Sequence, residues 1–137
     1  MDRRSLSNQE ISDLTWAEST PNIAQKNTMK KVNFDELESL KKSQEWLLVK
    51  FSGVACSPCI RMTDILNQVT PNYPQMTVIE ADALENLDEV MAFGLGRAVP
   101  QTFLYHNGVA VNTEKPFHLL GLRSTEDVDK VLSHFIQ

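Results

Sequence analysis

The stretch VKFSGVACSPCIRM, residues 49–62, contains both cysteines of this chain of 137 residues. The segment WLLVKFS (46–52), which overlaps its start, is almost continuously apolar, as is typical of a strand covered on both faces. Beyond the cysteines, apolar residues recur at helical spacing as far as Val69, and Pro71 and Pro74 are expected to end the helix. The stretch therefore predicts a buried strand followed by a helix, with the cysteine pair at the junction.

The segments on either side continue this alternation of strand and helix. On the N-terminal side, residues 29–32 predict a short strand, and Asn33 is placed to cap a helix that runs to about Ser43. On the C-terminal side, residues 76–81 predict a strand and residues 86–93 a short helix that ends at Gly94.

The last third of the chain has a different pattern. TFLYHNGVAV (102–111) predicts two strands joined at Asn107-Gly108, the strongest short signal for a hairpin. FHLLG (117–121) indicates a further strand, and Ser124 with Asp127 three residues on begins a final helix. The whole order predicts an α/β fold of three layers, with a central mixed sheet, helices on both faces and a C-terminal antiparallel hairpin.

Composition and charge argue against a nucleic-acid-binding or membrane protein. The chain has 13 basic and 18 acidic residues, a net charge of -5, so neither nucleic acid nor an anionic membrane is an expected partner. No apolar run approaches the roughly 18 to 20 residues that span a bilayer. Residues 1–28 are polar and lack the apolar core of a secretory signal. They are expected to form an extension, flexible or with a short helix, on a monomeric cytoplasmic domain of residues 29–137.

The position of the cysteines indicates redox chemistry. Cys56 falls at the N-terminus of the predicted helix, where free N–H groups and the helix dipole lower a thiol pKa and favour the nucleophilic thiolate. Cys59 lies on the same helix face, within the roughly 4.4 to 6.8 Å between Cα atoms that a disulfide requires. Cys56 is the candidate attacking thiol and Cys59 the resolving one. A zinc site, a cluster shared between two chains and a pair of inert core cysteines stay open as alternatives.

Three features together resemble the thioredoxin family over roughly residues 30–136. They are the strand WLLVKFS leading into CSPC, the segment AVPQTFLYHNG about forty residues on, and Gly121 before the last helix. The resemblance implies a thioredoxin-like fold in which Cys56 attacks and Cys59 resolves. It also implies that Val99–Pro100 is a cis peptide bond facing the disulfide, with the Val99 backbone free to pair with a substrate strand. No metal and no cofactor beyond the cysteines is implied.

The chain departs from the family pattern around the cysteines. Ala55 stands where the family usually has Trp, and Ser57-Pro58 replaces Gly-Pro between the cysteines. Gln101 replaces the threonine that follows the proline, and the loop GLGRAVP has one extra residue. We expect the residues around the cysteine pair to contact the substrate and to select different partners from those of the usual motif: Ala55, Ser57, Pro58, Val99 and Gln101.

Lys50 is the most informative departure. Six residues before the attacking cysteine, the family pattern has a buried aspartate near a lysine of the neighbouring strand, whereas this chain has Lys50 and, on the neighbouring strand, Glu80. A lysine inside LLVKFS is costly unless it is paired. We therefore predict a charge-swapped pair that assists proton transfer, with the carboxylate as base. The alternative is a Lys50 that reaches solvent at the strand end and has no chemical role.

The sequence thus predicts a thiol–disulfide oxidoreductase that reduces protein disulfides through Cys56 and Cys59 in the cytoplasm. Such an enzyme would take part in electron transfer and cell redox homeostasis, and a reductase partner would supply its electrons. Two alternatives differ in class. One is a binding or scaffold module with vestigial redox activity, and the other is a disulfide oxidase or isomerase.

Overall fold

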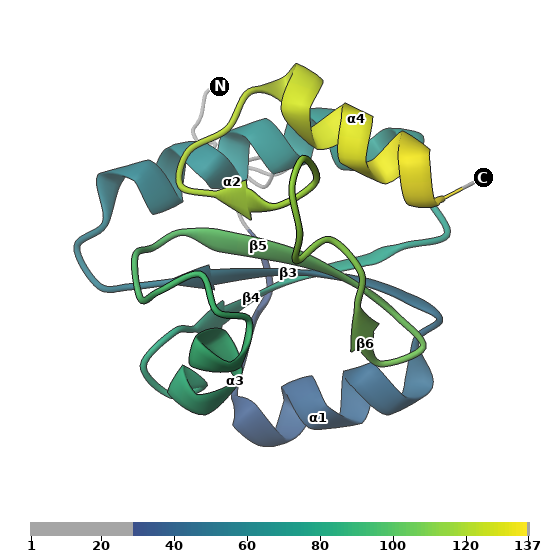
Figure 1. Ribbon diagram of the computed structural model, residues 1–137. Helices are drawn as coiled ribbons and strands as arrows, with labels where there is room; N and C mark the ends of the chain where they lie inside the picture. Colours follow the sequence, from purple (N-terminus) through teal and green to yellow (C-terminus); the bar gives the residue numbers. More distant parts are fainter. Residues whose placement is uncertain (1–28, 137) are drawn as a thin grey trace, which may run out of the picture.

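The structure, a computed structural model, describes residues 29–136, in which a six-stranded sheet lies between two pairs of helices (Figure 1). The α1 and α3 helices cover one face of the sheet, and α2 and α4 cover the other. The predicted α/β fold with its three layers is confirmed. The predicted extension of residues 1–28 lies outside the described residues.

The strands are β2 (Lys31–Val32), β3 (Trp46–Ser52), β4 (Thr77–Asp82), β5 (Gln101–His106), β6 (Val109–Ala110) and β7 (Leu119–Leu120). The helices are α1 (Phe34–Ser43), α2 (Ser57–Val69), α3 (Leu87–Ala92) and α4 (Thr125–Phe135), with a short 3-10 helix η2 (Thr70–Asn72) after α2. The α2 helix ends at Val69, just before Pro71, as predicted. Pro71 lies in the first turn of η2, where a proline loses no hydrogen bond.

Side-chain caps fix where two of the helices begin. Asn33 accepts a hydrogen bond from the Glu36 N–H, and the Glu36 side chain accepts one from the Asn33 N–H. Ser124 and Asp127 form the same reciprocal box at the start of α4. Each box satisfies two backbone groups that a helix end would otherwise leave without partners. Both caps were predicted.

The strand order is β2-β4-β3-β5-β6, and β7 pairs with the same side of β5 as β6. The strands β2, β4 and β3 are parallel, whereas β5 is antiparallel to β3 and to its hairpin partner β6. Ser52 therefore lies beside Asp82, and Phe51 beside Gln101, at one edge of the sheet. The cysteine motif, which follows β3, and Pro100, which precedes β5, therefore both lie at this same end of the strands.

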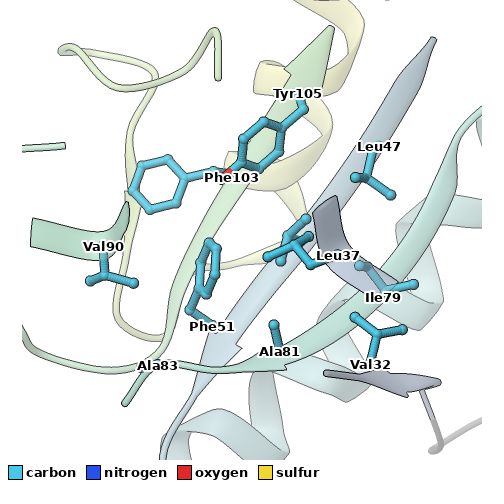
Figure 2. Close-up of a cluster of buried hydrophobic side chains, with 11 residues drawn as sticks. Val32, Leu37, Leu47, Phe51, Ile79, Ala81, Ala83, Val90, Phe103 and Tyr105 are labelled. Carbon is cyan, nitrogen blue, oxygen red and sulfur yellow. The ribbon is translucent and has the colours of Figure 1, made fainter. Parts of the chain in front are cut away.

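Each face of the sheet has its own core. Figure 2 shows the cluster on the α1 and α3 face, to which β3 contributes Leu47, Val49 and Phe51. On the opposite face, Leu48 packs with residues of α2 and α4, such as Met62 and Leu132. Because side chains alternate along a strand, Lys50 points to the same face as Leu48, toward α2. The alternation thus places a charged residue beneath the helix that carries the cysteines.

Candidate active site

Cys56 is the N-cap of α2, and its Sγ accepts a hydrogen bond of 3.2 Å from the Cys59 N–H. Pro58 sits in the first turn, where its missing N–H costs nothing. The two cysteines form a disulfide with their Cα atoms 5.2 Å apart, inside the predicted range. Cys56 is half-buried and Cys59 is only 3% exposed, so a partner reaches Cys56 first.

The arrangement of the two cysteines fits a redox pair better than a metal site or two inert core residues. Within residues 29–136, no group of three or more His, Cys, Asp or Glu is placed to hold a metal ion. The two thiols are instead joined to each other at the start of a helix, which is the arrangement a redox pair needs.

No helix within residues 29–136 is long and apolar enough to cross a membrane.

The segment before β5 faces the cysteine loop. The Val99–Pro100 peptide bond is cis, as predicted, and the Gly121 N–H donates to the Pro100 carbonyl at 2.7 Å. A Cβ on Gly53 would lie 3.2 Å from Val99 Cγ2, so this glycine lets the two loops approach closely. Among residues 29–136, neither the N–H nor the C=O of Val99 has a hydrogen-bond partner. Both are therefore available to an incoming strand.

Lys50 forms the predicted pair with Glu80. Its side chain is 1% exposed, and Nζ lies 3.1 Å from Glu80 Oε2. Nζ also donates to the Cys59 carbonyl at 2.7 Å and to the Thr63 hydroxyl. Three acceptors therefore satisfy the three N–H groups of the ammonium. The alternative in which Lys50 reaches solvent is wrong, because the helix that carries Cys59 covers it.

Thr63 is a member of the site that the sequence analysis missed. It lies one helical turn after Cys59 and is 8% exposed, and its hydroxyl donates to the Cys59 carbonyl at 3.3 Å. The spacing of four residues could have revealed it, since residues four apart share a helix face. Threonine is common in helices, however, and only the position of Lys50 beneath α2 makes this one part of the site.

The two members of the ion pair shift in the same direction for different reasons. Burial lowers the pKa of Lys50, and the carboxylate of Glu80 offsets this only in part. Burial also acts to raise the pKa of Glu80, but the neighbouring Ser52 hydroxyl and the Lys50 ammonium outweigh it, so that pKa lies below its usual value. The carboxylate is thus ionised at neutral pH, opposite the charged form of Lys50.

The predicted contact residues divide into two groups. Ala55 and Ser57 are exposed beside Cys56, and Pro58 and Val99 are half-buried next to them. Gln101 differs, because its side chain is fully buried and Nε2 donates to the carbonyls of Gly96 and Ala98, both at 2.9 Å. Its side chain points away from the disulfide surface, so the expectation that it contacts a substrate directly is corrected. It holds the loop that presents Val99.

Comparisons with known proteins agree with this geometry. The sequence model of the Thioredoxin family matches residues 21–133. The oxidised thioredoxin of Plasmodium falciparum superposes with a TM-score of 0.64 at 22% identity, over 80% of this chain and 100% of that one. Oxidised mitochondrial thioredoxin 3 of Saccharomyces cerevisiae gives 0.64 at 20% identity, over 81% and 99%. A search of curated proteins found no match.

These findings define the family and the general chemistry of the site. The solved structures share the fold, and the family match extends over most of the chain. Cys56 and Cys59 supply the CxxC motif and are placed to form a disulfide, which supports thiol–disulfide exchange in general. The chain belongs to the thioredoxin family.

Proposed function

We propose that the protein is a disulfide reductase that acts on other proteins, with Cys56 as the attacking thiol and Cys59 as the resolving thiol. The observation that carries the proposal is the difference in access within the pair. Cys56 caps α2 and is half-buried, whereas Cys59 is only 3% exposed. The loop that carries the unpaired backbone of Val99 approaches Gly53, three residues before Cys56. A substrate strand that pairs with Val99 would bring its disulfide against Cys56.

The exchange balances as two thiol–disulfide steps. The Cys56 thiolate attacks one sulfur of a substrate disulfide, and the other substrate sulfur leaves as a thiolate and takes up a proton. The Cys59 thiolate then attacks the Cys56 sulfur of the mixed disulfide, which releases the second substrate thiol. The substrate gains two electrons and two protons, and the protein is left with the Cys56–Cys59 disulfide. A reductase partner would return the electrons, in a reducing compartment such as the cytoplasm.

The Lys50–Glu80 pair supports the second step. The ammonium lies under the resolving cysteine and donates to its carbonyl, so it favours negative charge on the Cys59 sulfur. Glu80 is 21% exposed and contacts Lys50, so it can pass a proton between this buried position and water. The pair therefore supplies both the charge and the proton acceptor that resolution requires.

The same ammonium favours an alternative direction of transfer. A buried positive charge that stabilises thiolate also stabilises the reduced protein, and a strongly oxidising member of this fold class owes its potential to a stabilised reduced form. An oxidase or isomerase therefore stays as the second candidate function. Glu80 opposes this effect because it neutralises the ammonium at 3.1 Å.

The test is the equilibrium of the Cys56–Cys59 couple against graded thiol buffers, read by alkylation of free thiols. We expect a single two-electron transition near the reducing end of the range, at about -270 mV, together with turnover of a disulfide-bonded protein substrate. A midpoint near -120 mV would instead assign the oxidase or isomerase role. If turnover is absent and partner binding survives replacement of both cysteines by serine, the protein is a binding module.

A further inference from the structure

A cleft of about 340 Å³ opens beside the disulfide and is lined by both cysteines. Apolar walls are formed by Met29, Ala55 and Ile60. At its inner end are Lys50, Thr63 and Glu80, of which the first two are buried. The polar part of the lining is thus largely buried, and its exposed part includes the apolar side chains of Ala55 and Ile60.

A large apolar side chain of the lining, Ile60, is 68% exposed. Val54, the sequence neighbour of the lining residue Ala55, is 87% exposed. Water-exposed apolar groups that rim a concave surface are typical of contact sites. Small residues, Gly53 and Ala55, make up the adjoining part of the lining and leave the space between the rim and Cys56 open.

The charges at the inner end do not select an ionic ligand. The Lys50 ammonium already donates to the Cys59 carbonyl, the Thr63 hydroxyl and the Glu80 carboxylate. All three of its N–H groups are therefore in use. Because the ion pair also leaves little net charge there, the cleft discriminates by size and apolar area.

The covalent step determines what occupies the cleft. In a mixed disulfide the Cβ atoms of Cys56 and of the substrate cysteine lie about 3.8 Å apart, and adjacent Cα atoms in the substrate are another 3.8 Å away. A residue next to the attacked cysteine is therefore within side-chain reach of Ala55 and Ile60, which line the cleft together with Cys56. Resting on the reductase proposed above, we infer that the cleft receives a bulky apolar side chain flanking the attacked cysteine of the protein substrate.

The test uses the full chain with Cys59→Ser, which leaves Cys56 to form a stable mixed disulfide. Two symmetric disulfide-linked peptides are compared that differ only in the residue after cysteine, Phe or Ser. We expect the Phe peptide to form its adduct about tenfold faster. The ratio should fall toward one in Ile60→Ser, where an exposed wall is lost, and in Ala55→Trp, where the cleft is filled.

A matched control is Val109→Ser. The exposed fraction of Val109, 65%, is similar to the 68% of Ile60. Val109 is nevertheless far from the cleft in the sheet, because it pairs with His106 at the opposite end of β5 from Pro100. The peptide ratio should be unchanged in this variant. Equal rates for the two peptides in the parent, or an unchanged ratio in both cleft variants, overturn the inference. If neither peptide forms an adduct while Cys56 still reacts with an alkylating agent, the proposed reductase fails and the inference fails with it.

Discussion

Lys50 brings a charged group to the sheet face beneath α2, where it binds the Cys59 carbonyl. Desolvating an ammonium is expensive, and here three acceptors offset the cost: the Glu80 carboxylate, the Cys59 carbonyl and the Thr63 hydroxyl. A methionine would fill similar space without the charge. An arrangement that a simpler residue could replace is weak evidence for stability, and its position at the redox pair points to a role in exchange.

Lys50→Met and Glu80→Gln should each slow resolution of the mixed disulfide. Lys50→Met removes the positive charge bound to the Cys59 carbonyl, and Glu80→Gln removes the proposed base, so we expect losses of roughly tenfold to a hundredfold at pH 7. The measurement is quenched-flow detection of the mixed disulfide as the reduced protein meets a disulfide peptide. The role of Glu80 as base also predicts that the pH profile of this step shifts in Glu80→Gln.

Lys41→Met serves as the control for this prediction. Lys41 forms a comparable ion pair with Glu89, 2.8 Å away, but on the α1 and α3 side of the sheet. Its loss should leave resolution at the parental rate. Parental rates in both Lys50→Met and Glu80→Gln would remove the pair from the mechanism.

At the scale of elements, the loop between α3 and β5 depends on one side chain. Gln101 is the first residue of β5, and its amide donates to the carbonyls of Gly96 and Ala98. These bonds fasten a loop in which Gly94 and Gly96 adopt positive φ angles of 74° and 84°, a conformation that favours glycine. The loop reaches Val99, whose free backbone is the proposed docking strand.

Gln101→Thr and Gln101→Met should both loosen this loop. Each removes two hydrogen bonds, worth about 1 kcal/mol each, while Gln101→Met keeps most of the volume. We expect the KM for a disulfide substrate to rise roughly threefold to tenfold, with kcat and the Cys56–Cys59 potential unchanged. Steady-state kinetics and a thiol-buffer titration measure the two effects. A shifted potential with a constant KM would contradict the positioning role.

Much of the fold followed from local patterns, because each element carries its own signal. The apolar run of β3, the Asn107-Gly108 turn and the caps at Asn33 and Ser124 each act over a few residues. The cysteine pair could be predicted from its spacing at the start of a helix. The Lys50–Glu80 pair could be predicted from the family pattern, and the parallel register places the two residues side by side.

Other features depend on contacts that the sequence does not display. Gln101 was misplaced because its direction follows the parity of β5, in which Phe103 and Tyr105 point to the α1 and α3 face. Asn112 is fully buried and accepts from the Leu104 N–H at 2.8 Å, which depends on how the chain folds back after β6. The second cis bond, Lys115–Pro116, was not predicted either. No nearby motif signals these features.

For the molecule as a whole, each of the two cores includes one of the two tyrosines of the chain. Tyr105 belongs to the core on the α1 and α3 face, and Tyr73 packs against the core on the α2 and α4 face. Tyr105, 2% exposed, donates to Glu89, which also binds Lys41 of α1, so one network joins α1, α3 and β5. Burial, reinforced by the Glu89 carboxylate, raises the pKa of Tyr105 far above its usual value. Tyr73, half-buried, binds Asp129 of α4 at 2.7 Å, and burial raises its pKa as well.

These shifts predict a loss of stability at alkaline pH. Above about pH 10 an unfolded tyrosine releases its proton while Tyr105 keeps it in the folded state. The folded state then binds more protons, so stability falls as pH rises, by up to about 1.4 kcal/mol per pH unit. Lys41, whose pKa is raised by Glu89 and Glu38 despite burial, acts in the same direction, and Lys50, whose pKa is lowered by burial, acts against it.

In Tyr105→Phe the free energy of unfolding should therefore fall less steeply with pH in the alkaline range. Urea denaturation of the oxidised protein from pH 8 to 11 measures this slope. The variant loses the hydrogen bond to Glu89 and is less stable at pH 8, but its stability should decline less steeply above pH 10. Tyr73→Phe should reduce this slope much less, because its more exposed hydroxyl is deprotonated more easily in the folded state. Equal slopes in the parent and Tyr105→Phe would mean that the network does not hold the Tyr105 proton.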